Sequence, residues 1–419
     1  MKPKPKKKIV PKPKPKAKAK PKRKPRKKKV TLKGGTETTL PVGVEESPWA
    51  VAALPGGAHP DTSAQLKVLL KGIGGSCRLA DKDDMIVVPT TSPGLNRSLH
   101  ISGFPTECVV LLHGPSKGGK TVVALMLCAS FQMQGHFAVY VDAEHTLDKK
   151  LAMACDVNNA LLEYWRPKTY EETTKKVEQL INNFEAARKA KKILPHQCMV
   201  IVVDSITKLV PESELAELSK TGKGYPIRAL MNTNWLDKLT PMIGSLPIVF
   251  VMIAHEKVKI DAQSFEKKWR VKGGEALIYD STVAMRSQVE KALKIEKKKK
   301  KIVVGQLHKV VVEKSKVGIS HEQWKFAMSN GREGVPIGID HTRGVMEEAK
   351  LRGEGYLTRK TGGLWVCEQF PEGEIKFDSK VLSWFRSNPQ ALNEVIARMN
   401  IEAADAVVES HEAGDEEDE

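Results

Sequence analysis

The chain has 419 residues, 41% of them hydrophobic, which is enough to bury one large core and a smaller second one. No apolar run approaches the about 20 residues of a membrane-spanning helix, so we expect no such helix. The net charge of +18 is concentrated in residues 1–30, which hold seventeen Lys or Arg and no acidic residue, whereas residues 402–419 hold nine acidic residues and no basic one.

The N-terminal arm, residues 1–30, alternates lysine with proline and lacks the apolar period of a helix or strand. It is therefore predicted to be disordered and extended. Two interpretations stay open, namely a tail for solubility or localisation and a sequence-independent grip on nucleic-acid phosphates. Residues 31–60 are expected to be a linker, and Asp61 to Lys71 a short amphipathic helix, followed by a strand near Met85 to Val88.

The most informative stretch lies between an apolar run at Val109 to Leu112 and a helix-like run at Thr121 to Phe131. It reads Gly114-Pro115-Ser116-Lys117-Gly118-Gly119-Lys120-Thr121. The sequence Gly-x-x-x-x-Gly-Lys-Thr in this context is typical of a phosphate-binding loop, in which backbone N–H groups and the lysine bind phosphates and the threonine hydroxyl faces Mg²⁺. The alternative is a glycine-rich turn that happens to contain a lysine.

Strand-like and helix-like segments then alternate, which predicts an α/β fold with a mostly parallel sheet and helices on both faces. The expected strands are Ala138 to Val141, Met199 to Val203 and Ile248 to Ala254, and the expected helices are Tyr170 to Ala190 and Ile227 to Leu239. Glu144 and Asp204 follow the first two strands directly. Because ligands bind at the carboxyl ends of such strands, Asp204 is predicted to hold Mg²⁺ and Glu144 to orient or deprotonate a water that attacks the γ-phosphate. Each carboxylate alone could instead cap a strand end.

Four motifs in this order and spacing resemble those of the bacterial and phage RecA recombinases. They are the phosphate-binding loop, Val141-Asp142-Ala143-Glu144-His145-Thr146-Leu147-Asp148, Ile201-Val202-Val203-Asp204-Ser205 and Gly273-Gly274-Glu275-Ala276-Leu277. The resemblance extends from about Leu66 to Met399 and implies a P-loop RecA-like core. It also implies an ATP-dependent enzyme that forms helical filaments on single-stranded DNA and exchanges strands with homologous duplex DNA.

The resemblance assigns roles to individual residues. Glu144 would be the catalytic glutamate, together with Lys120, and Asp204 and Thr121 would hold Mg²⁺. The loop residues with Val122 would bind ATP, and Asp148 would lie near the adenine. Lys314 and Lys316 would reach the ATP of a neighbouring subunit; without the resemblance they would be two surface lysines.

The chain departs from the family at two positions. His255 stands where the family has the glutamine that senses the γ-phosphate, so we expect it to act at the catalytic centre with some pH dependence. Leu151 stands where the family has a tyrosine that stacks on adenine, so nucleotide selectivity and the rate of hydrolysis are open.

Two segments are expected to be DNA-binding loops, Pro211 to Gly224 and Lys257 to Lys272. The second combines cations, which suit phosphates, with aromatic rings, which can stack on bases. The expected DNA-contacting residues are Lys257, Lys259, Phe265, Lys267, Lys268, Trp269, Arg270, Lys272, Gly273 and Gly274. The alternative is a solvated loop with a packed aromatic.

An exposed antiparallel hairpin is expected around Lys297 to Lys301 and Lys309 to Glu313. By the resemblance, residues 61–90 form an oligomerisation region, 91–330 the ATPase core and 331–401 a small C-terminal α/β domain with candidate duplex contacts at Lys350, Arg352, Arg359 and Lys360. Residues 402–419 are expected to be a disordered acidic tail, which either competes with DNA for basic surface or is simply solvated.

The sequence thus predicts a cytoplasmic, DNA-associated recombinase that uses ATP and Mg²⁺ and binds single-stranded and double-stranded DNA. It would form a filament of identical subunits and be assisted by single-strand-binding and mediator proteins. Two alternatives are a RecA-fold motor or regulator without strand exchange, and a DNA-coating protein in which the arm binds DNA and the ATP site is vestigial.

Overall fold

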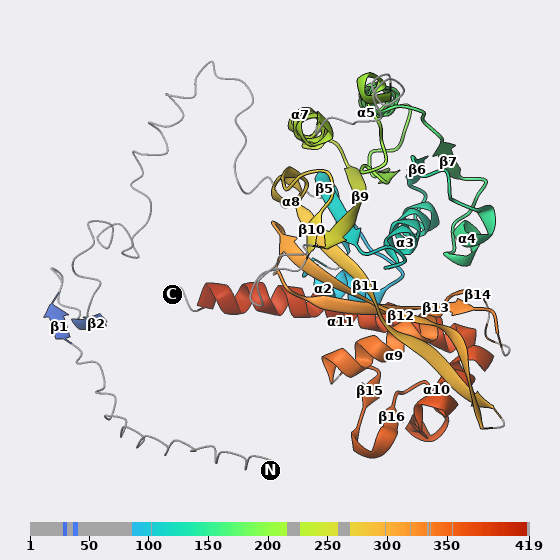
Figure 1. Ribbon diagram of the computed structural model, residues 1–419. Coiled ribbons are helices and arrows are strands. Elements are labelled where there is room, and N and C mark those ends of the chain that lie inside the picture. Colours follow the sequence, from blue (N-terminus) through green and yellow to red (C-terminus); the bar gives the residue numbers. More distant parts are fainter. Residues whose placement is uncertain are drawn as a thin grey trace, which may run out of the picture. The chain divides into compact units, whose positions relative to one another are not determined.

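The architecture comes from a computed structural model of the chain (Figure 1). It describes residues 28–31 and 37–40, and residues 86–416 except 102, 216–226, 259–268, 298, 319, 333–334, 336 and 354. Only the backbone is described for residues 28–31, 37–40, 258 and 403–416. The chain forms two compact units, Met1–Cys77 with Glu419, and Arg78–Asp418. The helix predicted over Asp61 to Lys71 lies outside the described residues.

The first unit contains two short antiparallel strands, β1 (Lys28–Thr31) and β2 (Glu37–Leu40). The sequence predicted an arm and a linker without regular structure here, so this pairing is a difference from the prediction. Both strands contain β-branched residues, and Gly34 and Gly35 separate them in the sequence, a composition that favours a hairpin.

The core of the second unit is a ten-stranded sheet with the order β14-β13-β12-β11-β5-β9-β8-β6-β7, in which β10 pairs with β9 (Figure 1). Strands β5, β9, β8, β6 and β7 are parallel, as predicted, and β11 pairs with β5 in the same direction. Strands β12, β13 and β14 then continue the sheet beyond β11 as antiparallel neighbours. The strands are β5 (Cys108–Gly114), β6 (Phe137–Asp142), β7 (Leu162–Trp165), β8 (Met199–Asp204), β9 (Ile248–Val258), β10 (Trp269–Val271), β11 (Val283–Lys297), β12 (Lys300–Ser315), β13 (Gln323–Asn330) and β14 (Ile337–Ile339).

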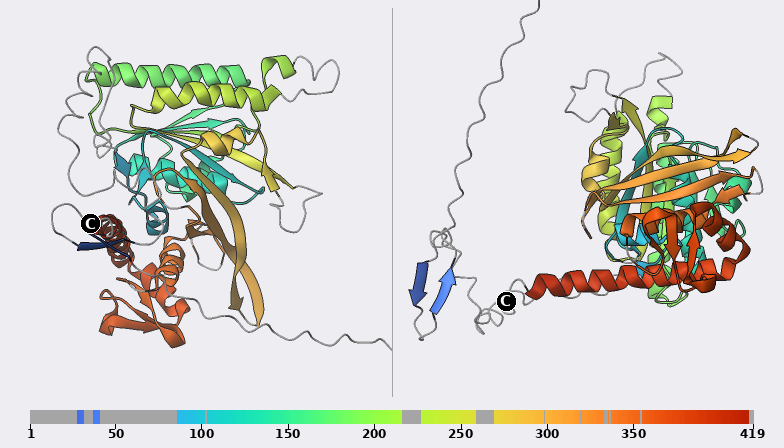
Figure 2. Two further views of the ribbon diagram at one scale, coloured as in Figure 1. Left: turned by 90° about the vertical axis from the view of Figure 1, so that its left-hand side faces the viewer. Right: turned by 90° about the horizontal axis from the view of Figure 1, so that it is seen from below.

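Both faces of the parallel strands are buried, which explains their continuous apolar sequences. In β5, Val109 and Leu111 belong to one hydrophobic cluster, and Val110 and Leu112 belong to another on the opposite face. Helices lie on both sides of the sheet (Figure 2). They are α5 (Tyr170–Lys189) and α7 (Ile227–Ile243) on one face, α3 (Lys120–Met133) on the other, and the shorter α4 (Lys149–Ala154) and α8 (Ala276–Asp280).

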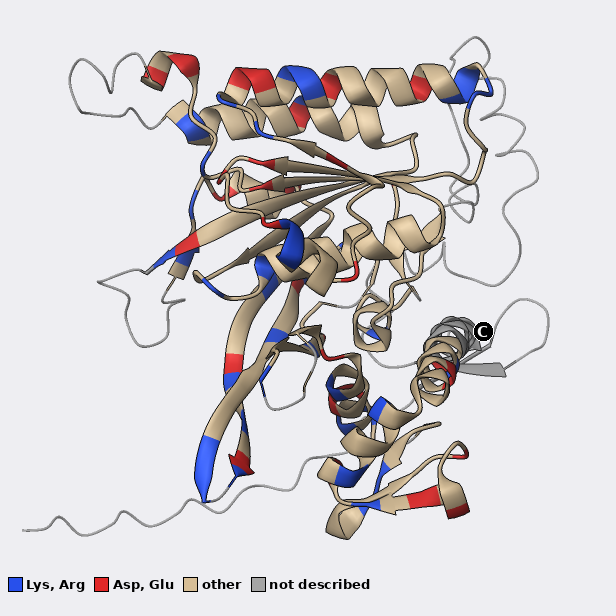
Figure 3. Ribbon diagram, turned by 90° about the vertical axis from the view of Figure 1, so that its right-hand side faces the viewer, with Lys and Arg blue, Asp and Glu red and all other residues tan. Residues whose placement is uncertain are grey.

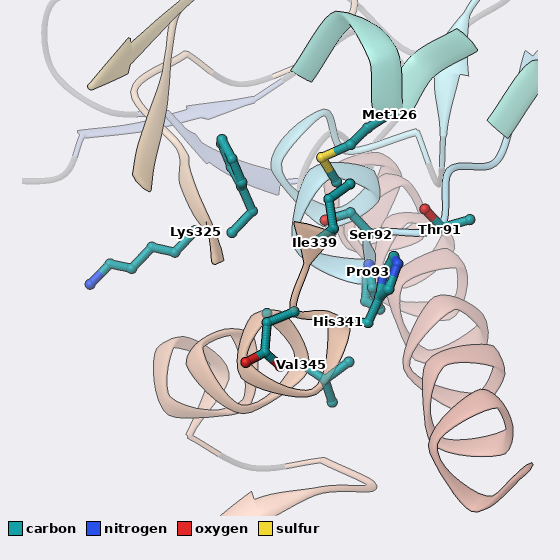
Figure 4. A pocket seen from close by; sticks show the side chains of 11 residues that line it. Thr91, Ser92, Pro93, Met126, Lys325, Ile339, His341 and Val345 are labelled. Atoms are coloured by element: carbon teal, nitrogen blue, oxygen red, sulfur yellow. The ribbon is translucent and has the colours of Figure 1, made fainter. Parts of the chain in front are cut away.

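The segment that precedes β5 packs closely against α3 and β14. The short strands β3 (Val87–Val88) and β4 (Phe104–Pro105) flank α2 (Pro93–Ser98), a helix that the sequence did not predict. Met126 of α3 and Ile339 of β14 line a cavity of about 20 Å³ beside α2 (Figure 4). This volume holds about one water molecule, so the junction is a packing contact.

The small C-terminal domain has its own core, centred on Trp365, Phe370 and Phe385. Its elements are α9 (His341–Arg352), β15 (Thr358–Arg359), β16 (Leu364–Val366), β17 (Glu374–Lys376), α10 (Asp378–Ser387) and α11 (Pro389–Glu416).

Two boundaries differ from the predicted ones. Residues 337–339, which the sequence placed in the small domain, form β14 and pair with β13 of the core sheet. Helix α11 continues to Glu416, through most of the segment predicted to be a disordered tail. Ala403, Ala404 and Ala406 have high helix propensity and allow the helix to continue into the acidic sequence.

No helix within the described part of the chain is both long and apolar enough to cross a membrane. Five cysteines, Cys108, Cys128, Cys155, Cys198 and Cys367, are free and buried. Burial raises the pKa of the Cys128 thiol to about 12, which agrees with a packing role.

Candidate nucleotide site and DNA-binding segments

The predicted phosphate-binding loop connects β5 to α3. Strand β5 ends at Gly114 and α3 begins at Lys120, with Gly119 as its N-cap at a φ of 95°. Gly119 has no side chain to cap the helix, so backbone N–H groups and the positive end of the helix dipole remain at the loop. This geometry is that of an anion-binding site.

The Lys120 side chain folds over the loop. Its Nζ donates hydrogen bonds to the carbonyl oxygens of Gly114 (3.0 Å) and Pro115 (2.8 Å), and the residue is only 5% exposed. Burial lowers the pKa of the ammonium group, and the nearby carboxylates of Asp204 and Glu144 oppose this effect. The loop therefore carries a cation that lies close to acidic groups.

Asp204, at the end of β8, lies against the start of α3. Its Oδ2 accepts hydrogen bonds from Thr121 Oγ1 (2.7 Å) and Tyr140 OH (2.6 Å). Burial raises the pKa of Asp204, the two hydrogen bonds oppose the rise, and the carboxylates of Glu144 and Asp142 add to it. Tyr140 was not predicted from the sequence, because a tyrosine inside an apolar strand looks like any core residue.

These oxygen atoms fit Mg²⁺. Within the described residues no group of three or more His, Cys, Asp or Glu could hold a metal ion. One carboxylate and one hydroxyl, from Asp204 and Thr121, are nevertheless the donor set that Mg²⁺ needs when phosphate oxygens and water complete its shell.

Glu144 follows β6 and is held by two donors. Its Oε1 accepts hydrogen bonds from His255 Nε2 (2.6 Å) and Ser205 Oγ (2.7 Å). The hydrogen bond with His255 is the main reason that the pKa of Glu144 is lowered to about 2; partial burial opposes it and Ser205 adds to it. Glu144 is therefore ionised at neutral pH, and since a carboxylate only accepts, Nε2 of His255 carries the proton.

The loop, the two carboxylates and His255 surround one cavity of about 300 Å³. The lining residues are Ser116, Lys117, Gly118, Gly119, Lys120, Thr121, Val122, Glu144, Leu151, Asp204, His255, Gln306, His308 and Met328. The last three come from β12 and β13 and were not predicted, since no local motif marks strands that fold back from so far along the chain. Asp148 is the N-cap of α4, the helix that contains Leu151, and its contact with a base stays a prediction.

The ends of the first predicted DNA loop are tied together. Arg228, at the start of α7, donates from Nε and Nη2 to both carboxylate oxygens of Glu214 (2.7 and 2.8 Å). Residues 216–226, most of the predicted loop, lie outside the described residues.

The second predicted DNA segment begins and ends as a β-hairpin. Lys257 lies in β9 and pairs with Arg270 of β10, and Trp269 of β10 pairs with the next residue of β9. The Trp269 ring lies 5.1 Å from that of His113, and the Arg286 guanidinium lies 4.7 Å from the Trp269 ring centre. Trp269 therefore packs against side chains of its own chain, and its contact with DNA stays a prediction.

The other predicted DNA contacts are placed as follows. Lys272 follows β10, and its backbone N–H donates to the His255 carbonyl (2.8 Å). Gly273 and Gly274 have φ values of 102° and 111°, and the Gly273 carbonyl accepts from Asn232 Nδ2 (2.9 Å). Lys259, Phe265, Lys267 and Lys268 lie outside the described residues.

A buried ion cluster connects this hairpin to the strand before the phosphate-binding loop. His113 is fully buried, with Nδ1 3.0 Å from Glu256 Oε1 and Nε2 3.5 Å from Glu313 Oε2. Burial lowers the pKa of His113, but the hydrogen bonds and charges of Glu256 and Glu313 outweigh it, and the net effect is a raised pKa. Arg286 donates to both oxygens of Glu256 (2.7 and 3.0 Å). This cluster could not be predicted from the sequence, because its members are far apart in the chain.

Basic residues gather at the end of the β11–β12 hairpin (Figure 3). Lys299, Lys300 and Lys301 are exposed there. A hairpin is present as predicted, but its strands are β11 and β12: Lys297 pairs with Lys300 at the hairpin end, and Lys309 to Glu313 lie inside β12, where Val310 and Val312 are buried. In the small domain, Lys350, Arg352 and Arg359 form ion pairs with acidic side chains of this chain (2.9–3.4 Å). Their predicted role in duplex binding would have to compete with these pairs.

The chain is similar to known proteins of one family. The RecA N-terminal domain family matches residues 71–335. The chain is 28% identical to Protein RecA of Limosilactobacillus reuteri over 333 residues, covering 79% of this chain and 84% of that protein. It is 30% identical to Protein RecA of Mesoplasma florum over 321 residues (75% and 86%), and 28% identical to that of Saccharopolyspora erythraea over 351 residues (82% and 93%).

The chain belongs to the RecA family. The resemblance inferred from the four motifs is confirmed, as is the predicted fold class. The identities of 28–30% to these relatives make it a divergent member.

Lys314, one of the two lysines predicted to reach the ATP of a neighbouring subunit, contacts backbone carbonyl groups of its own chain. Lys314 Nζ donates to the carbonyl oxygens of Ile278 (3.0 Å), Ser281 (2.8 Å) and Tyr279, at the carboxyl end of α8. Burial, with the neighbouring charge of Lys316, lowers the pKa of Lys314. Lys314 thus satisfies carbonyl groups at a helix end, and its contact with a neighbour's ATP stays a prediction.

Proposed function

We propose that this RecA family member is an ATP-dependent DNA recombinase that acts in the cytoplasm. It would form helical filaments on single-stranded DNA, hydrolyse ATP with Mg²⁺, and exchange strands with homologous duplex DNA. The observation that carries the proposal is the convergence of the phosphate-binding loop, Asp204 and the Glu144–His255 pair on one cavity.

The geometry supports a role for each residue of the site. Backbone N–H groups of the loop and Lys120 would bind the phosphates. Thr121 and Asp204 would hold Mg²⁺, which neutralises phosphate charge when bound. Glu144, with a pKa of about 2, is a weak base, so its main role would be to orient the attacking water. His255 would keep the Glu144 carboxylate in place by donating from Nε2.

Filament assembly would add groups from a second subunit. We propose that Lys314 and Lys316 act there, with Lys314 leaving the α8 carbonyls as the interface forms. The segments around residues 211–224 and 257–272 would bind DNA. Single-strand-binding and mediator proteins remain predicted partners.

The test combines two assays on the full chain. ATP turnover is measured with and without single-stranded DNA, and strand exchange is followed with fluorescently labelled oligonucleotides. Lys120→Ala should abolish both, and Glu144→Gln should bind ATP but hardly hydrolyse it. Turnover without strand exchange would instead favour a RecA-fold motor or regulator, and DNA binding unaffected by ATP would favour a coating protein.

A further inference from the structure

Strands β11 and β12 form a wall against the phosphate-binding loop. A Cβ atom added at Gly114 would lie 2.1 Å from the Ser287 carbonyl oxygen, and one at Gly118 would lie 2.5 Å from it. A Cβ atom at Gly119 would lie 2.7 Å from Nδ1 of His308 and 2.8 Å from the ring of Phe326. The glycines of the loop are therefore needed for close approach to these strands as well as for backbone conformation.

The wall holds one peptide group of the loop. The carbonyl oxygen of Gly118 accepts hydrogen bonds from Ser287 Oγ (2.6 Å) and from His308 Nδ1 (3.0 Å). Two donors satisfy both lone pairs of this oxygen. Because a carbonyl only accepts, the proton of His308 must be on Nδ1.

The His308 ring is itself fixed. It is 4% exposed and stacks on Phe326, its neighbour across β12 and β13, with ring centres 4.7 Å apart and planes 5° apart. Burial lowers the pKa of His308, opposed by the bond to Gly118, so the ring is neutral near pH 7. Ser287 is fully buried on β11. Neither residue belongs to a motif that the sequence singled out.

The bonds at Gly118 determine where the next N–H group points. A trans peptide is planar, and its C=O and N–H bonds point to opposite sides. Since the Gly118 carbonyl points towards β11 and β12, the Gly119 N–H points away from that wall. Gly118, Gly119 and His308 all line the cavity of the nucleotide site.

We propose that His308 and Ser287 are positioning residues for nucleotide binding, which fix the Gly118–Gly119 peptide so that its N–H is directed at a phosphate oxygen before ATP arrives. This inference rests on the proposed ATP site but assigns it two further residues. A loop held in this way binds phosphate without first paying the entropy of ordering its backbone.

The variants separate hydrogen bonding from packing. His308→Phe keeps a ring to stack on Phe326 and removes the donor, whereas His308→Asn places an amide N–H near the position of Nδ1. Ser287→Ala removes the second donor. Ser329→Ala is the matched control, because Ser329 is also buried and donates to a backbone carbonyl, that of Val304 (3.3 Å), away from the loop.

The readout is the affinity of the full chain for a fluorescent non-hydrolysable ATP analogue with Mg²⁺. We expect His308→Phe and Ser287→Ala each to weaken binding roughly fivefold, the effect of one neutral hydrogen bond. The double variant should lose more affinity than the product of the two single losses, because no donor then holds the Gly118 carbonyl. His308→Asn should bind within about twofold of the natural chain. In turnover assays KM should rise while kcat changes little, because the lost contact stabilises the bound substrate and the transition state equally.

Thermal unfolding without nucleotide checks that the variants fold. The inference is overturned if the natural chain binds the analogue and the double variant binds it equally well, or if Ser329→Ala weakens binding as much as Ser287→Ala. If the natural chain fails to bind the analogue, the proposed function itself is wrong.

Discussion

Asp204→Asn should make the protein more stable while it abolishes Mg²⁺-dependent nucleotide binding. Asp204 is 5% exposed, and the carboxylates of Glu144 and Asp142 raise its pKa further than burial alone. A folded-state pKa above the ordinary 3.8 means that the ionised group costs stability at neutral pH, and that this cost disappears as the pH falls through the raised value towards 3.8. Asparagine removes the charge, and its Oδ1 can still accept from Thr121 and Tyr140.

The expected gain in stability of Asp204→Asn can be estimated from the removal of the carboxylate charge. Removing this buried charge while its hydrogen bonds are kept should gain about 1 kcal/mol, the low end of the range found when buried ion pairs are replaced. For a domain of this size that corresponds to a rise in Tm of about 2–4 °C. Mg²⁺ with an ATP analogue at about 100 times Kd should stabilise the natural chain by about 2.7 kcal/mol and the variant hardly at all.

The assay is thermal unfolding with and without Mg²⁺ and the analogue, and Asp142→Asn is the control. Asp142 pairs with Asp204 across β6 and β8, but its oxygens accept from Tyr164 OH and from two backbone N–H groups, of Glu144 and Leu147. An amide cannot replace both oxygens, so this variant should lose about 1–3 kcal/mol. The reasoning is refuted if Asp204→Asn lowers the Tm or keeps the ligand-induced shift.

Three further predictions follow from other sites. His255→Leu should lower kcat roughly tenfold because Glu144 loses its main donor, whereas His255→Gln, which keeps an amide N–H, should stay within about threefold; equal loss in ATPase assays would contradict this role. The raised pKa of His113 implies stability that is present below its ordinary 6.5 and is lost as the pH rises through the folded value. The Tm of the natural chain should therefore exceed that of His113→Gln most at about pH 6 and least at about pH 9, and a constant difference would argue against the charge. Deletion of residues 1–30 should flatten the salt dependence of DNA binding and leave ATP affinity unchanged; an unchanged slope would remove the arm from DNA binding.

The convergence of the loop, Glu144 and Asp204 on one cavity could be predicted because these residues sit in local motifs. Glu144 and Asp204 directly follow apolar strands, and the carboxyl ends of adjacent parallel strands meet at one edge of a sheet. The loop was recognisable from eight consecutive residues. The family assignment then rested on the order of four such motifs.

The wall of the site could not be predicted in the same way. His308, Gln306 and Met328 reach the loop only because β11 to β13 fold back beside β5, and that register depends on long-range pairing that no short sequence carries. The surroundings of Trp269 could not be predicted either, because its packing partners His113 and Arg286 lie far from it in the sequence.

The most direct test of the proposed recombinase is electron microscopy of protein that begins at Thr31. It should be mixed with single-stranded DNA, with and without a non-hydrolysable ATP analogue, beside Lys120→Ala. We predict helical filaments that require the analogue and are lost in the variant. Rings, or filaments that form equally well without nucleotide, would contradict a recombinase driven by the site at Lys120, Glu144 and Asp204.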